Sequence, residues 1–337
     1  MTSDNMNSIK ICGEHKSKID IAVLLIFFNR PEKFAQVFAA VKQARPSRLY
    51  LYQDGVRANR MDDIQNVVKC REIAENIDWE CEVFQKYQTE NFGCDPSEFI
   101  AQKWMFETED MGIILEDDDV PAQSFFPFCK ELLLKYKDDN RINMICGMNN
   151  TDISKHIEAD YLFTKKGSIW GWASWRRVLD LWDGTYSWLN DREKLLKIKE
   201  QMSLPDYEKF IDNAKKHAAT GKEYYETINA ATMYINESLN IVPKYNMISN
   251  IGVGGESTHG SEDYRLLPRK IAKLLHKKTY EISFPLKHPT EVKRDYYFEK
   301  KMSFTRLDKF LMHFESAFRT LIFKGPKYFI NKAKERF

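Results

Sequence analysis

The chain has 337 residues, of which 43% are hydrophobic and 30% charged, the composition of a water-soluble globular protein. This length suits one large α/β domain with additions. No apolar run approaches the ~18 residues of a membrane span and no apolar signal segment follows Met1, so we expect a cytoplasmic protein. The six cysteines form no Cys-x-x-Cys pair and no zinc pattern, which is typical of reduced thiols.

The net charge of +2 conceals a division between two parts of the chain. Residues 1–263 carry 32 Lys and Arg against 42 Asp and Glu, whereas residues 264–337 carry 19 against 7. An acidic body followed by a strongly basic tail predicts an anionic partner for the tail.

Short apolar runs alternate with helical patterns along the first 150 residues. Pro31 suits the first turn of a helix, and the apolar residues that follow it recur at helical spacing. Such alternation predicts βαβ units and a mostly parallel sheet flanked by helices, that is, an α/β fold. The expected strands are 19–28, 48–53, 82–86, 112–115 and 142–146, and the further helices are 62–75, 96–107 and 125–136.

The pattern changes after residue 149. Residues 167–183 hold four tryptophans, and residues 189–239 are mostly helical. Short strands are expected at 161–164, 239–243 and 247–252, followed by a glycine-rich loop at 252–260.

Four consecutive carboxylates, residues 116–119, directly follow the apolar run 112–115. Pro121 cannot donate to a strand ladder, so the strand ends before it. Open α/β sheets bind ligands at this carboxyl edge, and adjacent acids repel one another unless a cation joins them. Hard oxygen ligands suit Mn²⁺ or Mg²⁺. The alternative is a solvated acidic turn.

Several nucleotide and hydrolase motifs are absent from the sequence. There is no G-x-G-x-x-G after the first strand, no G-x-x-x-x-G-K-[ST] loop and no G-x-S-x-G elbow. This counts against a dehydrogenase, a P-loop NTPase and an α/β-hydrolase. A metal held by few protein ligands beside a nucleotide pocket remains, and it could neutralise a diphosphate leaving group.

Four short segments together resemble a nucleotide-sugar glycosyltransferase with the GT-A fold: FNRP, QDG, LEDDDVP and WGWASWRR. The nearest resemblance is to bacterial family-two-like enzymes of surface-polysaccharide synthesis, and a more distant one is to N-acetylglucosaminyltransferase I. The resemblance covers about residues 19–260. It implies a catalytic domain over 19–263, with a nucleotide-binding half (19–150) and an acceptor half (151–263), and a basic helical C-terminal extension over 264–337.

The resemblance also implies roles for donor-binding residues. Arg30, with the neighbouring Asn29, matches the residues after the first strand that meet the nucleotide; the alternative for Arg30 is a surface charge at a helix start. Asp54 matches the acid that hydrogen-bonds the base or ribose, although Asp-Gly is also a common turn. Asp117 matches the acid that faces the ribose and donor sugar in similar enzymes, and the adjacent Glu116 is a further candidate for binding the nucleotide sugar.

By the same resemblance, Asp118 binds the metal directly. Related enzymes have an uncharged residue at the position of Asp119, so this chain offers a second acid there, and Asp119 is the alternative ligand. His259, in the glycine-rich loop, matches a late histidine that completes the metal or diphosphate site. Tyr225-Glu226 takes the place of the aromatic–acid pair that supplies the general base of inverting enzymes, so Glu226 is the candidate base and Glu223 the fallback.

Tryptophan rings pack cores and also stack on sugar faces. We expect Trp170 or Trp172, beside the flexible Gly171, to line the donor or acceptor pocket, and the remaining tryptophans to belong to the core.

The resemblance thus predicts a Mn²⁺- or Mg²⁺-dependent inverting glycosyltransferase. It would move a hexosyl or N-acetylhexosaminyl group from a nucleotide-diphosphate sugar, with a UDP-sugar favoured, to a glycan or lipid-linked acceptor. One alternative is a sugar-nucleotide pyrophosphorylase, although FFNRP lacks the glycine-rich loop expected there. The other is a non-catalytic carbohydrate-binding protein.

Residues 305–323 place apolar side chains at i, i+3, i+4 and i+7, and basic residues follow them. A basic amphipathic helix predicts contact of residues 305–337 with a membrane surface, which would make the protein peripheral to the inner membrane. The alternative is that the apolar stripe packs on the body or in a homodimer. No nucleic-acid-binding motif accompanies the charge, so nucleic acid is not expected as a partner.

Overall fold

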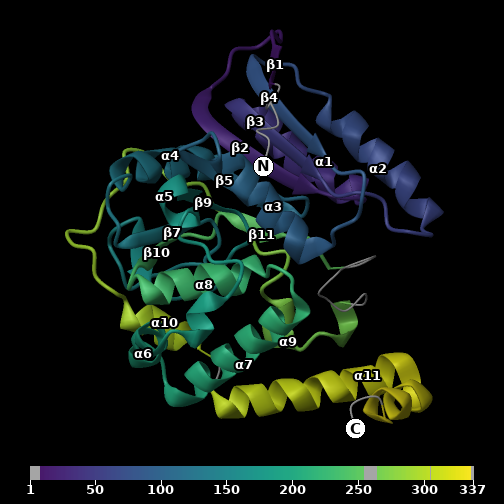
Figure 1. Cartoon of the computed structure of the whole chain (residues 1–337), viewed down its shortest axis with the longest axis vertical. Helices are drawn as coiled ribbons and strands as arrows, with labels where there is room; N and C mark the ends of the chain where they lie inside the picture. Colours follow the sequence, from purple (N-terminus) through teal and green to yellow (C-terminus); the bar gives the residue numbers. More distant parts are fainter. Residues whose placement is uncertain (1–7, 254–263, 304, 335–337) are drawn as a thin grey trace.

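A nine-stranded sheet forms the centre of the molecule in the computed structural model, which describes residues 8–253, 264–303 and 305–334 (Figure 1). The strand order is β1-β4-β3-β2-β5-β9-β7-β10-β8. Within these residues, β2, β3, β4, β5, β7 and β10 run in one direction, and β1, β9 and β8 run against them. The predicted α/β fold with a mostly parallel sheet flanked by helices is therefore confirmed.

The strands of the described residues lie close to the predicted ranges. They are β1 (Ser8–Ile11), β2 (Ile19–Phe27), β3 (Pro46–Gln53), β4 (Cys81–Tyr87), β5 (Met111–Glu116), β6 (Asp119–Pro121), β7 (Ile142–Cys146), β8 (Tyr161–Thr164), β9 (Trp172–Trp175), β10 (Leu239–Pro243) and β11 (Ile248–Asn250). β6 and β11 pair with each other outside the main sheet.

The helices follow the predicted alternation. They are α1 (Pro31–Ala44), α2 (Met61–Ala74), α3 (Cys94–Phe106), α4 (Phe125–Lys135), α5 (Arg176–Leu179), α6 (Arg192–Glu200), α7 (Leu204–Thr220), α8 (Tyr225–Ile235), α9 (Arg269–Ala272), α10 (Tyr296–Met302) and α11 (Arg306–Lys334), with the 3₁₀ turns η1 (Ser187–Asn190) and η2 (Tyr264–Leu266). In the described parts of the chain we find no helix with the length and apolar character of a bilayer crossing.

The order of the first parallel strands creates a topological switch point. From β2 the chain moves outward through β3 to β4 and then returns to place β5 on the other side of β2. Right-handed crossovers put α1 and α2 on one face of the sheet and α3 on the other. Ligands of open α/β sheets bind beside the carboxyl ends of the two strands at such a point, here β2 and β5.

The tryptophan-rich segment enters the middle of the sheet. Residues 172–175 form β9, which lies antiparallel between β5 and β7, and all four of its residues are buried. Trp175 donates from Nε1 to the carbonyl oxygen of Leu133 at 3.0 Å, which gives its polar atom a partner inside the core. We predicted no strand here, because a segment of only four residues is too short for an alternation of apolar and polar residues to be recognised.

Segments toward both ends of the described chain pack on the domain that contains the central sheet. At the start, β1 pairs antiparallel with β4, so the sheet begins before Ile19. After Ala272 the chain returns over the body. Ser124 Oγ accepts a hydrogen bond from Ile282 N–H at 2.9 Å, and Phe298 is buried in the core. The helical C-terminal extension is confirmed, but residues 276–303 pack on the body and only α11 extends along its outside (Figure 1).

Candidate functional site

Arg30 joins the ends of β2 and β5. It follows β2 directly because Pro31 starts α1, and its guanidinium forms an ion pair with Asp117 and donates from Nη1 to Asp118 Oδ2 at 2.8 Å. Asp117 is 3% exposed and Asp118 6%. Burial opposes the positive charge of Arg30, but both carboxylates raise its pKa above the ordinary value. The structure thus brings together three of the predicted residues at the switch point.

Asp119 is built into the fold. Its side chain is fully buried, Asn250 Nδ2 donates to Oδ1 at 3.0 Å, and Gly171 N–H donates to Oδ2 at 2.8 Å. Gly171 has φ of +60°, and a Cβ there would overlap Ile248. Asn250 also donates to Asp118 Oδ1 at 2.9 Å, so one amide holds both acids. Sequence analysis missed Asn250, which is an unremarkable residue in a short strand.

A second set of carboxyl groups lies behind this pair. Burial raises the pKa of Glu116 well above its usual value, and the charges of Glu98 and Asp119 add to the effect. Burial likewise raises the pKa of Glu98, with a further contribution from Glu226. Glu98 comes from α3, where no sequence motif indicates a functional role. The site therefore holds more carboxyl groups than Arg30 and its neighbour Lys33 can neutralise, and the raised pKa values favour the protonated forms of Glu98 and Glu116.

The backbone of Gly252 passes directly against the side chain of Asp118. A Cβ at Gly252 would overlap Asp118 Oδ2, so only glycine allows the chain to pass so close. Lys33 Nζ donates to the carbonyl oxygen of Gly252 at 2.6 Å and fixes this segment over α1. Burial and the charge of Arg30 lower the pKa of Lys33.

Asp54 and Asn29 are held by their own surroundings. Asp54 Oδ1 accepts from Phe92 N–H at 2.9 Å and Oδ2 accepts from Gly93 N–H at 3.0 Å, so this acid organises the loop before α3. Asn29 Nδ2 donates to Asp63 Oδ1 at 2.7 Å, and Arg57 binds the same carboxylate. Both residues lie beside the switch point, where their side chains fix loops.

The two tryptophans proposed as sugar contacts have different environments. Trp172 is fully buried, and its ring stacks on Tyr225 with centroids 6.4 Å apart. It presents no surface to a ligand and is a core residue, which corrects the expectation for Trp172. Trp170 is half-buried and lines a pocket of about 440 Å³ together with Glu226. Glu226 is exposed in the first turn of α8, where an acid also suits the helix dipole.

The floor of this pocket is polar. Asn143 Nδ2 donates to Asn229 Oδ1 at 3.1 Å and to Asn240 Oδ1 at 3.0 Å, and Asn143 Oδ1 is buried with no hydrogen-bond partner among the described residues. Lys165 is 6% exposed, and its Nζ donates to the carbonyl oxygen of Met233 at 3.4 Å. Burial lowers the pKa of Lys165 to about 8. Amides, an amine and an aromatic ring suit a hydroxyl-rich ligand.

The carboxylate chemistry of the site fits a hard divalent cation. Among the described residues no three His, Cys, Asp or Glu are arranged to hold a metal ion, and His259 lies outside the described residues. Mg²⁺ usually takes one or two protein carboxylates and completes its shell with water and substrate phosphates. Asp118 and Asp117 place two adjacent carboxylates at the switch point, whereas Asp119 is fully buried. Both oxygens of Asp118 accept hydrogen bonds here, from Arg30 and Asn250, so a metal ion would share or replace those contacts.

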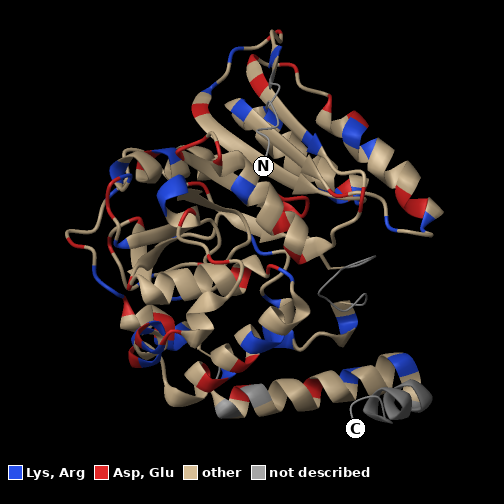
Figure 2. Ribbon diagram, viewed as in Figure 1, with Lys and Arg blue, Asp and Glu red and all other residues tan. Residues whose placement is uncertain are grey.

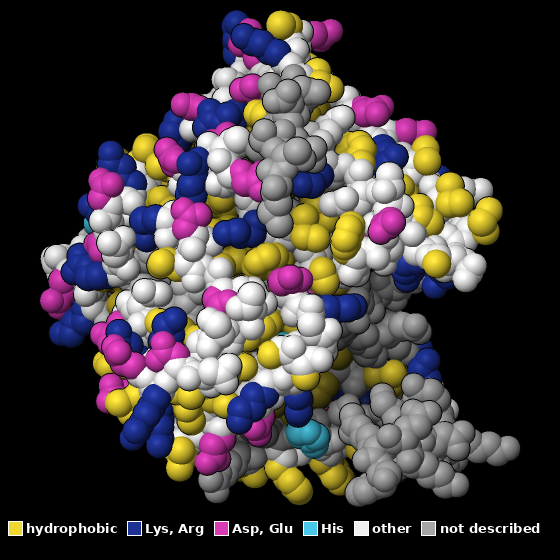
Figure 3. Space-filling view, viewed as in Figure 1, with side chains coloured by type: hydrophobic (Ala, Val, Ile, Leu, Met, Phe, Trp, Pro, Cys, Tyr) yellow, Lys and Arg dark blue, Asp and Glu magenta, His cyan; other side chains and the backbone are white. Residues whose placement is uncertain are grey.

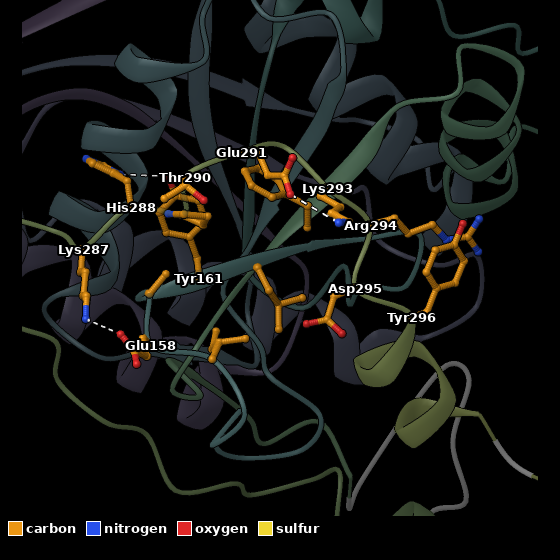
Figure 4. A pocket seen from close by; sticks show the side chains of 15 residues that line it. Glu158, Tyr161, Lys287, His288, Thr290, Glu291, Lys293, Arg294, Asp295 and Tyr296 are labelled. Carbon is orange, nitrogen blue, oxygen red and sulfur yellow. Dashed lines mark hydrogen bonds and ion pairs between the residues drawn. The ribbon is translucent and has the colours of Figure 1, made fainter.

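A further pocket lies at the edge strand β8, between it and the returning segment 287–296, with a volume of about 540 Å³ (Figure 4). Its charged side chains pair with one another: Lys287 with Glu158 at 3.2 Å and Lys293 with Glu291 at 3.4 Å. With these charges already neutralised locally, we assign no chemistry to this pocket.

Comparison with known proteins gives no family for the chain. No family model matches it, and no curated protein matches it in sequence. A solved UDP-glucose pyrophosphorylase in complex with UDP-glucose aligns at 8% identity with a TM-score of 0.32, over 67% of this chain and 91% of that one. A chain described as a glucose-1-phosphate thymidylyltransferase from Bacillus anthracis, in complex with sucrose, aligns at 6% identity with a TM-score of 0.26, over 58% and 83%. Likeness at this level assigns no activity to this chain.

Proposed function

We propose that the protein is an enzyme that binds a nucleotide-diphosphate sugar at the β2–β5 switch point and transfers the sugar to an acceptor hydroxyl. The observation that carries the proposal is the meeting of Arg30, Asp117 and Asp118 at this edge of the sheet. It supports the resemblance to GT-A glycosyltransferases that the motifs FNRP and LEDDDVP indicate.

In the proposed donor site, Asp118 is the metal ligand and Asp117 orients Arg30 toward the nucleotide. A bound Mn²⁺ or Mg²⁺ would supply charge neutralisation for the departing diphosphate. Arg30 adds a fixed positive charge to the same place. We propose that Asp119 and Asn250 hold the side chain of Asp118 in position. Asn250 donates to both acids, and Asp119 also accepts from Gly171 N–H.

In the proposed acceptor site, Glu226 is the general base and Trp170 lies against the acceptor. The two residues line one pocket whose floor carries Asn143 and Lys165. A base must lie within hydrogen-bond reach of the hydroxyl whose proton it takes, and an exposed carboxylate at a pocket rim meets that requirement. The arrangement supports an inverting single displacement, with UDP-sugars as the favoured donors and a glycan or lipid-linked acceptor.

The alternative is a nucleotidyltransferase, the activity that the names of both aligned structures give to those proteins. Three residues, Phe28–Arg30, connect β2 to α1 in this chain, and none is glycine. So short a link leaves little backbone to surround a triphosphate, which favours the transferase.

One experiment separates the two activities. Nucleotide sugars are incubated with the protein and Mn²⁺, first alone and then with pyrophosphate, and the nucleotides are separated by chromatography. A glycosyltransferase releases nucleoside diphosphate slowly and ignores pyrophosphate, whereas a nucleotidyltransferase forms nucleoside triphosphate. Triphosphate formation would overturn the proposed reaction, and release by neither route from any donor would overturn the proposed substrate class.

A further inference from the structure

Helix α11 contacts α9 and η2, which precede it in the chain, through its polar face. Asp308 forms an ion pair with Lys270, and Glu315 Oε2 accepts from Arg269 N–H at 3.2 Å. Arg319, one turn beyond Glu315, donates to that carboxylate at 2.9 Å and so continues the same face. Positions 308, 315 and 319 share one side of a helix because they are seven and four residues apart. This is the reverse of the usual arrangement, in which a helix buries its apolar side.

The opposite side of α11, called here the outer face, is apolar and exposed. Figure 3 shows hydrophobic side chains projecting from the lower edge of the molecule along this helix. Soluble monomers rarely expose a continuous apolar stripe of this length, so the outer face is expected to have a partner. Its residues are 41% to 67% exposed: Leu307, Phe310, Leu311, Phe314, Phe318, Leu321 and Ile322.

The charge around the outer face identifies the kind of partner. Residues 305–337 contain eight Lys and Arg against three Asp and Glu, and two of those acids, Asp308 and Glu315, are paired with basic groups. In Figure 2 the neighbouring α9 also carries Lys and Arg. A second copy of this helix would bring two strongly positive segments together, which costs free energy, whereas an anionic surface would neutralise them.

We propose that the outer face of α11 binds the surface of a membrane that contains anionic lipids. The helix would lie in the plane of the surface, with its phenylalanines in the boundary between headgroups and acyl chains. The helical run is broken at Gly325, where φ is +81°, so the basic segment beyond it takes a new direction. This inference does not depend on the sugar-transfer reaction, since it concerns binding alone.

The test is co-sedimentation of the full-length protein with vesicles of phosphatidylcholine alone and of phosphatidylcholine with phosphatidylglycerol, at low and high salt. We expect binding to the mixed vesicles that weakens in high salt, since each basic residue at an anionic surface adds roughly fivefold to the affinity. A triple variant on the outer face, Phe310→Gln with Phe314→Gln and Phe318→Gln, should weaken binding by at least about a hundredfold.

A control triple variant removes exposed leucines elsewhere: Leu134→Gln with Leu181→Gln and Leu204→Gln, whose exposures are 51% to 55% against 55% to 67% for the three phenylalanines. It should bind vesicles like the original protein. Both variants change exposed side chains, and equal thermal melting of all three proteins establishes that the fold is retained. Absence of wild-type binding to the mixed vesicles would overturn the proposal, as would equal loss in both variants. A concentration-dependent dimer that the phenylalanine changes dissociate, without vesicle binding, would instead assign the face to a second copy.

Discussion

Replacement of Asp118 by Asn separates ligand binding from stability at the proposed donor site. The carboxylate lies 2.8 Å from Arg30 Nη1 and 2.9 Å from Asn250 Nδ2. Asparagine keeps the shape and removes one charge, but its amide nitrogen replaces one acceptor oxygen and so costs one hydrogen bond. Arg30 retains its ion pair with Asp117. Since burial raises the pKa of Asp118 despite Arg30, the charged form is disfavoured in the fold. We expect the free energy of unfolding at neutral pH to change by no more than about 1 kcal/mol, because relief of charge repulsion offsets the lost hydrogen bond.

The same change should alter the pH dependence of stability. A carboxyl whose folded pKa lies above its unfolded value of ~3.9 binds more protons in the folded state between the two values. Stability therefore falls as pH rises through that window. Wild type, with raised pKa values at Glu98, Glu116, Asp118 and Asp119, should lose stability from about pH 4 upward, and Asp118→Asn should lose less. Urea denaturation at a series of pH values measures this.

Asp118→Asn should weaken the binding of UDP and Mn²⁺ far more than it changes stability. Loss of an outer partner of a metal ligand usually costs 10- to 100-fold in affinity, so loss of the ligand itself should weaken Mn²⁺-dependent UDP binding by at least about 100-fold. Isothermal calorimetry with and without Mn²⁺ gives the two constants. Asp138→Asn, an 88% exposed acid outside the site, is the matched control and should bind like wild type. Normal UDP and Mn²⁺ binding by Asp118→Asn would refute the assignment.

Four further variants test the pocket at β7 and α8 and the core beside it. Glu226→Gln should keep donor affinity but lower turnover by roughly 100-fold or more, and near-normal turnover in a transfer assay would move the base elsewhere. Trp170→Ala should raise the acceptor KM with little change in melting temperature, whereas Trp172→Ala should destabilise the fold by about 3 kcal/mol or more because its ring is fully buried. Lys165, whose pKa is lowered to about 8, keeps its buried charge below that pH, so wild-type stability should rise as pH increases from about 8 to about 10.5, by on the order of 2 kcal/mol. Lys165→Met should abolish that rise in denaturation experiments, and a persistent rise would assign it to another group.

Strong local patterns made much of the fold predictable from the sequence. The apolar run before Asn29 and the proline after Arg30 predict β2 and α1, since a buried strand and a helix start each have a local cause. Both elements occur as expected. The acids after β5 were placed at the carboxyl edge by the same reasoning, and the structure puts Asp117 and Asp118 there, against Arg30.

Only the tertiary structure shows what surrounds each of these acids. The sequence left Asp118 and Asp119 as alternative metal ligands. In the structure Asp119 is fully buried against Gly171 and Asn250, whereas Asp118 contacts Arg30 and Asn250, and these partners are far away in the chain. Glu98 joined the site only because α3 crosses the sheet beside β5. Such contacts depend on how elements separated by tens of residues pack, and no local period carries that information.

The same division applies at the C-terminus. The sequence determined that residues 305–323 form an amphipathic helix, because the spacing of leucines and phenylalanines is a local property. It left open which side of that helix meets the body. The structure places the polar side against α9, because Lys270 and Arg269 of that helix, some forty residues earlier, offer partners to Asp308 and Glu315. The direction of an amphipathic face is set by the surface that it meets, and that surface exists only after folding.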